Sequence, residues 1–345
     1  MDYNNFSKSV LKWYNLNKRD LPWRYKGNTK KDPYKIWVSE IMLQQTTVTA
    51  VIPYFKKFIT LWPNIEKLSS ADINEILDFW SGLGYYRRAK NLHLTSKIIN
   101  KDYNNIFPKD EVQIKNLPGI GDYTSAAIRA IAFNENDTVV DSNIERIIAR
   151  VFQIQEPIEK AKKEIKEKAK KLTPNIKNGD YAQALMDIGS KVCLPKNPLC
   201  NSCPILKFCK AKKNSCENTI PIKVKKKIKP VREGSVYWII SSDNKVLLKR
   251  RLDKGILPGM LEFPSYGWST DANEEIDKKV LSIKDFKIKK GKVSHQFSHF
   301  NLLLTVYEKK EFNVNDINGM WVDKKDLNNL GLPTLMKKVF NHINT

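Results

Sequence analysis

The spacing of hydrophobic residues changes about two thirds of the way along this chain. From Phe6 to about Leu172, apolar residues recur every three or four positions, which is typical of helices that bury one face. The sequence therefore predicts a mostly α-helical first part, with helices over residues 34–59, 73–80, 89–100, 122–133, 158–172 and 181–191.

The last third of the chain follows a different pattern, with short β-branched and aromatic runs separated by turn residues. Strands are predicted over 236–240, 246–249, 261–264, 292–297, 302–307 and 320–322, before a closing helix over 332–342. Residues 218–233 are basic, contain two prolines and lack a helical face, which indicates a linker able to lie along DNA. We therefore predict a helical domain over 1–217, a linker over 218–233 and a smaller α/β (α+β) domain over 234–345.

Charge indicates the kind of partner. Sixty Lys and Arg residues against 37 Asp and Glu give a net charge of +23, which attracts a polyanion such as nucleic acid. The chain is also rich in Asn and Ile, so a biased genome that raises Lys without a ligand stays open as an alternative. No apolar run is long enough to cross a bilayer, and the N-terminus lacks an apolar leader. We expect a cytoplasmic, DNA-associated protein that binds no membrane.

The stretch from Leu117 to Arg146 carries the strongest local signal. Pro118 fixes φ, Gly119 and Gly121 permit positive φ, and an alanine-rich helical run follows. Free backbone N–H groups at such a helix start can bind a phosphate without any charged side chain. The pattern predicts a tight turn that leads into a helix, and the stretch resembles the helix–hairpin–helix element of base-excision DNA glycosylases, at about 110–133. A glycine turn of purely structural role is the alternative.

Two carboxylates are candidates for catalysis. Glu40 lies among large apolar residues in a predicted helix over 34–46, where loss of water would raise its pKa and make it a general acid. Asp141 ends the β-branched run that begins at Thr138. One protonated and one ionised carboxyl group are what cleavage of a glycosidic bond requires. The alternatives are that Glu40 points into solvent and that Asp141 only caps a helix beginning at Ser142.

Four of the five cysteines lie within seventeen residues, at Cys193, Cys200, Cys203 and Cys209. Because the chain lacks an export signal, this C-x6-C-x2-C-x5-C spacing favours a metal site over disulfides. Zinc is the metal that four clustered cysteines most often bind. Neighbouring lysines could also contact phosphates. Cys216 is expected to stay outside the ligand set.

Five motifs occur in order along the chain: LPWR at 21–24, SEIMLQQT at 39–46, GLGYYRRAKNLH at 82–93, LPGIG at 117–121 and VDSN at 140–143. Together they resemble the adenine DNA glycosylases of the MutY type, in the helix–hairpin–helix superfamily of base-excision glycosylases. The resemblance implies hydrolysis of the N-glycosidic bond of adenine opposite 8-oxoguanine or guanine in double-stranded DNA. It also implies base flipping, a [4Fe-4S] cluster on the four cysteines in the loop 193–209, and action as a monomer.

By this resemblance, Glu40 would protonate adenine at N7, so that the base departs neutral, and Asp141 would stabilise the sugar cation. Asn143 would help to position it, and Tyr123 would line the same site. The residues implied to contact DNA are Trp23 and Arg24 at the flipped adenine, Gln44, Gln45 and Tyr85 in the opened base stack, and Gly119 and Gly121 at the backbone.

Tyr123 also discriminates within the superfamily. Members that resemble endonuclease III carry a lysine at this position, which forms a Schiff base and leads to strand cleavage. A phenol cannot form an imine. We therefore expect a monofunctional glycosylase with little or no lyase activity.

The C-terminal region carries two further features. The run HQFSHFNLLL resembles the loop with which this family recognises 8-oxoguanine, so Phe297, Ser298 and His299 would be the readers, with ordinary hairpin chemistry as the alternative. The run GILPGMLEFPSY at 255–266 resembles a strand of Nudix-type domains. No Arg-Glu-x-x-Glu-Glu element for divalent metal occurs in the sequence, so this domain should hydrolyse nothing.

Two rival functions remain at this stage. One is a related helix–hairpin–helix mismatch glycosylase that acts on pyrimidine mismatches, against which the Phe297–His299 loop argues. The other is a non-enzymatic DNA-binding or redox-sensing iron–sulfur protein, which would require Glu40 and Asp141 to lie apart in the fold.

Overall fold

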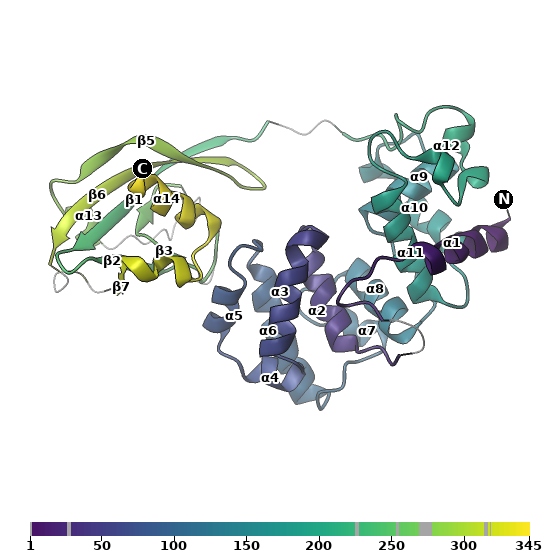
Figure 1. Ribbon diagram of the computed structural model, residues 1–345, viewed down its shortest axis with the longest axis horizontal. Helices are drawn as coiled ribbons and strands as arrows, with labels where there is room; N and C mark the ends of the chain where they lie inside the picture. Colours follow the sequence, from purple (N-terminus) through teal and green to yellow (C-terminus); the bar gives the residue numbers. More distant parts are fainter. Residues whose placement is uncertain are drawn as a thin grey trace. The chain divides into compact units, whose positions relative to one another are not determined.

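The computed structural model describes residues 2–25, 29–224, 228–252, 255–268, 278–313, 317 and 319–345. Its contacts divide the chain into two compact units, one made of residues 1–70 and 94–226, the other of residues 71–93 and 227–345 (Figure 1). Strand β1 begins at Val231, so the last residues of the predicted linker 218–233 already pair in a sheet. No helix among the described residues is long and apolar enough to cross a membrane.

The first unit is built of helices, as the three-to-four-residue spacing predicts. They are α1 (Tyr3–Asn17), α2 (Pro33–Leu43), α3 (Val48–Leu61), α4 (Ile65–Ser70), α7 (Glu111–Lys115), α8 (Asp122–Phe133), α9 (Ser142–Phe152), α10 (Ile158–Leu172), α11 (Asn178–Lys191) and α12 (Lys210–Lys213), with short 3₁₀ turns at Cys200–Ser202 and Leu206–Phe208. Helices α5 (Ile73–Phe79) and α6 (Arg87–Asp102) begin in the segment 71–93.

One sequence prediction about these helices is wrong. The helix predicted over 34–59 is two helices, because the chain leaves the helical conformation after Leu43 and Gln45 adopts a left-handed φ of 56°. Thr47 then caps α3 by accepting a hydrogen bond from the backbone N–H of Ala50 at 3.4 Å. The helix predicted over 34–46 likewise ends at Leu43, which leaves Gln44 and Gln45 on the connecting turn.

Helix α2 lies between α3 and α8 (Figure 1), and eight of its residues are buried. Helix α11 packs on both α8 and α9, and Ala127, Ile144, Ile147 and Ile188 are fully buried in the core that these helices share. Burying a large aliphatic side chain contributes about 1.5–3 kcal/mol, so this core fixes the helix ends around it. The residues predicted for catalysis lie on α2, on α8 and at the start of α9.

The second unit contains a mixed sheet whose strand order is β3-β2-β1-β6-β5, with β4 pairing to β1 and β7 to β2. Its elements are β1 (Val231–Ser241), β2 (Lys245–Arg250), β3 (Leu261–Glu262), β4 (Ser265–Tyr266), α13 (Lys278–Ser282), β5 (Lys287–Gln296), β6 (Asn301–Phe312), β7 (Met320–Asp323) and α14 (Thr334–Asn344). β1 and β6 run parallel, and the other pairs are antiparallel. Apolar residues of α14 join the core of the sheet around Trp238 and Phe263.

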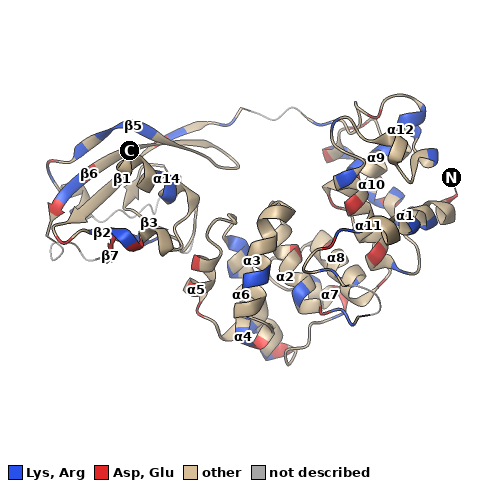
Figure 2. Ribbon diagram, viewed as in Figure 1, with Lys and Arg blue, Asp and Glu red and all other residues tan. Residues whose placement is uncertain are grey.

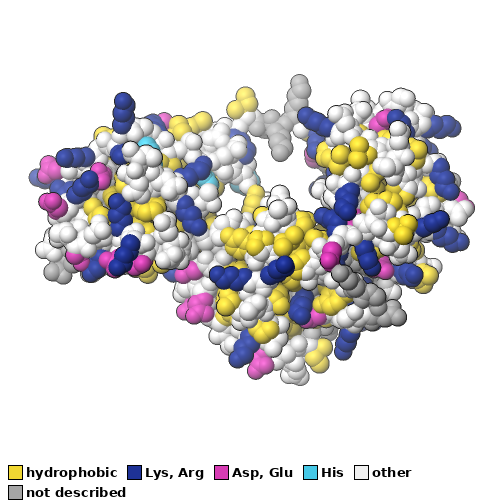
Figure 3. Space-filling model, in the orientation of Figure 1, with side chains coloured by type: hydrophobic (Ala, Val, Ile, Leu, Met, Phe, Trp, Pro, Cys, Tyr) yellow, Lys and Arg dark blue, Asp and Glu magenta, His cyan; other side chains and the backbone are white. Residues whose placement is uncertain are grey.

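The positive charge is spread over both units. Figure 2 shows Lys and Arg on helices of the first unit and on strands β5 and β6 of the second. On the face drawn in Figure 3, basic side chains are scattered among apolar and neutral ones, and acidic side chains are fewer. The net charge of +23 therefore does not come from a single basic tail.

Candidate functional site

Glu40 lies inside the first unit. Glu40 is only 6% exposed, because α2 is buried on most of its faces and Trp37 and Ile41 flank Glu40 in the same helix. The Tyr123 hydroxyl donates a hydrogen bond to Glu40 Oε2 at 2.9 Å. Burial raises the pKa of Glu40 to about 7 against the opposing effect of that hydrogen bond, and the charge of Asp141 raises it further. A substantial fraction of Glu40 is therefore protonated at neutral pH.

Asp141 precedes α9 and serves as its N-cap. Asp141 Oδ1 accepts a hydrogen bond from the Ile144 N–H at 2.8 Å, and Oδ2 accepts one from Asn143 Nδ2 at 2.9 Å. Burial raises the pKa of Asp141, whereas these two hydrogen bonds lower it. Asp141 can therefore cap α9 and also act on Glu40, because the cap holds its carboxylate where its charge raises the pKa of Glu40.

Arg146 connects this site to the cysteine loop. Its guanidinium donates to Asn143 Oδ1 at 2.9 Å, to the carbonyl of Gly189 at 2.6 Å and to the carbonyl of Cys193 at 2.7 Å. Our sequence reasoning missed this residue. Its spacing of three from Asn143 within one helix was a visible signal, but its partners on α11 and beyond depend on how the helices pack.

A small cavity adjoins Glu40. Its volume is about 40 Å³, which is room for a few water molecules. Two of the residues predicted to contact a flipped base, Trp23 and Arg24, are in its wall, and Gln183 is a lining residue that the sequence did not single out. The full lining is Arg19, Leu21, Trp23, Arg24, Ile36, Ser39, Glu40, Leu43, Val48, Ile131, Gln183 and Met186.

The predicted hairpin is formed by α7, a turn and α8. Gly119 uses the positive φ that glycine permits, at 79°, whereas Gly121 is extended, with a φ of −96°. Gly121 is instead the N-cap of α8, and since it has no side chain, the N–H groups of the first turn are uncapped. A helix start of this kind can bind a phosphate. Gln44, also predicted to face DNA, donates to Thr124 Oγ1 of α8 at 3.1 Å.

In the second unit, the loop between β5 and β6 carries Phe297, Ser298 and His299. Phe297 is partly buried and stacks on Trp268, with ring centroids 6.0 Å apart, and on Phe300 at 4.8 Å. Ser298 and His299 are exposed. Within this unit the Tyr85 hydroxyl lies 3.1 Å from Ser298 Oγ. The aromatic stack supports the loop from below and leaves its polar side chains accessible.

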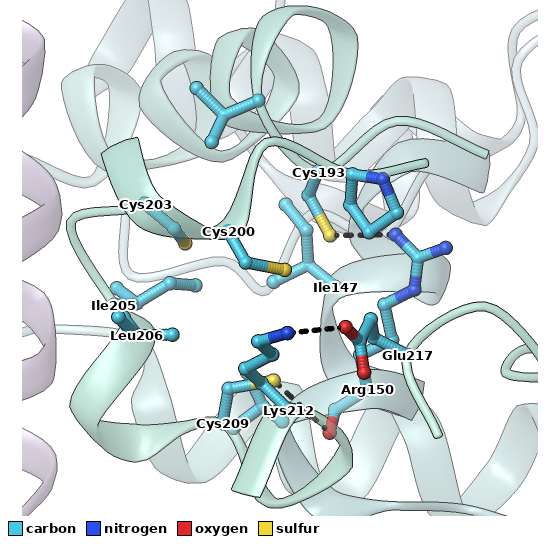
Figure 4. Close-up of a pocket in the computed structure, with 13 residues that line it drawn as sticks. Ile147, Arg150, Cys193, Cys200, Cys203, Ile205, Leu206, Cys209, Lys212 and Glu217 are labelled. Carbon is cyan, nitrogen blue, oxygen red and sulfur yellow. Dashed lines mark hydrogen bonds and ion pairs between the residues drawn. The ribbon is translucent and has the colours of Figure 1, made fainter. Parts of the chain in front are cut away.

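The four clustered cysteines line one apolar cavity of about 20 Å³ together with Ile147, Ile205 and Leu206 (Figure 4). All five cysteines of the chain are free thiols. Arg150, buried beside them, donates to Cys193 Sγ at 3.2 Å. Burial raises the pKa of Cys203 to about 12, so a bound cationic centre would be needed to hold it as a thiolate.

The donor set fits an iron–sulfur cluster in its chemistry, since four thiolates are the usual ligands of a [4Fe-4S] centre. In the described part of the chain, no group of three or more Cys, His, Asp or Glu side chains is arranged to hold a single metal ion. Each thiolate of a cluster binds a different iron, so a cluster does not require its ligands to converge on one point.

Comparison with known proteins finds one family match in the helical part of the chain and one in the C-terminal part. Residues 38–175 match the model of the HhH-GPD superfamily of base excision DNA repair proteins, and residues 235–342 match the NUDIX domain. An adenine DNA glycosylase of Buchnera aphidicola subsp. Baizongia pistaciae is 36% identical, over 98% of this chain and 96% of the relative. The adenine DNA glycosylase of Homo sapiens is 30% identical, over 97% of this chain and 73% of the relative.

A solved structure, a thermostable thymine-DNA glycosylase, is similar to the helical part. It is 31% identical with a TM-score of 0.55, over 61% of this chain and 97% of that one. Together with the two domain matches, this confirms the predicted fold: a helical first part followed by a smaller domain with a mixed sheet.

The close approach of α11 to Asn143 generates a testable prediction. A Cβ at Gly189 would lie 2.5 Å from the Cβ of Asn143, so Gly189→Ala must push the two helices apart. We expect a loss of about 1–3 kcal/mol in the free energy of unfolding, as for other overpacked core positions. Chemical denaturation measures it, with the exposed neighbour Ser190→Ala as the matched control. A Gly189→Ala protein as stable as the wild type would contradict the close packing.

Proposed function

Because this chain belongs to the adenine DNA glycosylase family and is a DNA glycosylase of base excision repair, we propose that it removes adenine mispaired with 8-oxoguanine or guanine in double-stranded DNA. The observation that carries the proposal is that Asp141 acts electrostatically on a buried Glu40 whose pKa is raised to about 7, while Tyr123 donates a hydrogen bond to Glu40.

In the proposed reaction, Glu40 gives its proton to the adenine ring, at N7, as the bond between the base and the sugar breaks. The base then leaves neutral, and Asp141, held by Asn143 and the start of α9, stabilises the positive charge that develops on the sugar. Water adds to the sugar and completes the hydrolysis. Tyr123 offers no amine, so no Schiff base forms and the enzyme is monofunctional.

Adenine would enter the cavity beside Glu40 only after it has left the base stack. The cavity has room for a few waters, so its walls, including Trp23 and Arg24, must separate to admit a base. Phosphates next to the flipped nucleotide would be bound by the uncapped start of α8, which supplies N–H groups and the positive end of a helix dipole.

The base opposite adenine is assigned to the second unit. 8-Oxoguanine differs from guanine by an oxygen at C8 and a hydrogen at N7, and the exposed Ser298 hydroxyl can accept or donate a hydrogen bond to those groups. The stacking of Phe297 on Trp268 supports this assignment, because it holds the loop while Ser298 and His299 stay accessible.

We also assign a [4Fe-4S] cluster to Cys193, Cys200, Cys203 and Cys209. The cluster would tie together the loop that follows α11 and, in company with nearby lysines, help to hold DNA phosphates. Cys216 is left out of the ligand set, since its Sγ contacts the carbonyl of Ala211 and it does not line the cysteine cavity.

A panel of labelled duplexes tests the substrate. Single-turnover incubation with A:8-oxoguanine, A:G, A:T and T:G duplexes, read with and without alkali, should give alkali-dependent cleavage at adenine in the first two. Excision of thymine from T:G would instead favour the activity named for the solved structure that resembles the helical part. Cleavage without alkali would contradict the monofunctional assignment.

Glu40→Gln should bind the A:8-oxoguanine duplex normally and lose excision. The amide keeps the shape of the side chain but has no acidic proton to give, and such a proton contributes on the order of 10²- to 10⁴-fold. Single-turnover excision measures the loss, with Glu66→Gln on the surface of α4 as the matched control. Near-normal excision by Glu40→Gln would refute its role as the general acid.

Protein purified without oxygen should be brown and contain about four irons per chain. Cys216→Ser should keep the full iron content, whereas Cys203→Ser should lower it. Metal analysis measures the iron content of each protein, and the visible absorption spectrum detects the cluster. Stoichiometric zinc without iron would count against the cluster.

Ser298→Ala should lower the preference for 8-oxoguanine over guanine in binding by roughly ten- to a hundredfold, because one or two hydrogen bonds to a base edge supply about 1–3 kcal/mol of discrimination. Single-turnover excision from A:G should be unchanged. Ser294→Ala, an exposed serine of β5, is the matched control. If the preference survives in Ser298→Ala, 8-oxoguanine is read elsewhere.

A further inference from the structure

Asp187 is a fully buried carboxylate that the proposed reaction does not use. It lies on α11, and its side chain is 0% exposed. Asp187 Oδ1 accepts hydrogen bonds from Arg19 Nε at 2.6 Å and Arg24 Nη2 at 2.8 Å. Oδ2 accepts from Arg24 Nη1 at 2.6 Å and from the backbone N–H of Arg19 at 3.1 Å. Both oxygens are therefore engaged twice, and the pair with Arg24 is bidentate.

All of these contacts reach one short segment of irregular backbone. Residues 18–25 follow α1 without forming a helix, and they carry Leu21 and Trp23, which are both buried in the wall of the cavity beside Glu40. Irregular segments have few backbone hydrogen bonds of their own to fix them. A buried bidentate ion pair supplies both direction and strength, so Asp187 anchors this wall to α11.

The Asp187 carboxylate also counters the positive charge of Arg24, which acts on the proposed general acid Glu40. Arg24 acts on Glu40 electrostatically and lowers its pKa, in opposition to burial and to Asp141. In the described part of the chain, the groups that act on the pKa of Glu40 are Asp141, Arg24 and Tyr123 of α8, whose hydroxyl donates a hydrogen bond to it. An arginine whose charge is matched by a bidentate carboxylate exerts a weaker field than one without a counter-ion.

We propose that Asp187 is a positioning residue of the adenine site, which holds the 18–25 segment against the Glu40 cavity and neutralises Arg24 beside Glu40. It contacts neither the base nor the sugar, and it acts through Arg24 and the 18–25 segment that lines the Glu40 cavity. This inference rests on the proposed function, because its consequence is read in adenine excision.

The test is the pH dependence of single-turnover excision from an A:8-oxoguanine duplex. In the wild type the rate should fall as the pH rises through about 7, because Glu40 then loses the proton that it must give. In Asp187→Asn the unmatched charge of Arg24 should favour the ionised form of Glu40. We expect the rate to drop at least tenfold at neutral pH and the decline to begin at lower pH.

Arg24→Gln examines the same arrangement from the other side and remains informative if Asp187→Asn does not fold. It removes the positive charge beside Glu40, so the decline should move to higher pH, the opposite direction. Asp180→Asn is the matched control, since it makes the same charge change on α11, and its profile should follow the wild type. Thermal unfolding and duplex binding of each variant report on folding.

The outcomes separate this inference from the proposed function. A wild-type protein that excises no adenine from any duplex refutes the proposed function. An active wild type with an Asp187→Asn rate that falls equally at all pH values, or with an Arg24→Gln decline that does not move upward, overturns the role of Asp187. Opposite shifts in the two variants support it.

Discussion

The carboxyl group of Glu40 is the constraint on which the rest of the site depends. To act as the general acid that we propose, this group must be kept from water near neutral pH, and α2 achieves this because it carries apolar residues nearly all round and lies between α3 and α8. Raising its pKa from the ordinary 4.5 to about 7 corresponds to roughly 3 kcal/mol of free energy of unfolding. That stability is present below pH 4.5 and is lost as the pH rises through about 7 and Glu40 ionises.

The surrounding helices must offset the stability that is lost when Glu40 ionises, and they must also hold the second carboxylate, Asp141, in place. The buried isoleucines of α8, α9 and α11 provide the stability. The N-cap of α9 holds Asp141, because Asp141 cannot move without breaking its hydrogen bond to the N–H of Ile144. Arg146 then joins the cap to Gly189 of α11 and to Cys193. Arg146 therefore links the cysteine loop directly to Asn143, which in turn donates a hydrogen bond to Asp141.

Much of this arrangement could be predicted from the sequence, because it depends on local patterns. The helix after LPGIG, the apolar run around Glu40 and the change of period into the sheet are all visible in the spacing of residue types. The break at Gln45 was missed, since apolar spacing continues across it and the left-handed residue is not a glycine. The sequence did not reveal which conformation Gly121 adopts, because a glycine in a turn can serve as an N-cap as readily as a residue with positive φ.

The contacts that sequence reasoning could not find are those between residues far apart in the chain. Asp187 lies 163 residues from Arg24 and has no neighbour in sequence that marks it as more than a helical aspartate. Its importance follows from an electrostatic requirement. In a chain of net charge +23 that must attract DNA, an acid that has to stay protonated needs a local environment unlike the rest of the molecule. Burial and Asp141 raise the pKa of Glu40, and the neutralisation of Arg24 that we propose for Asp187 would act in the same direction, so the acidity of Glu40 depends on its immediate neighbours rather than on the net charge of the chain.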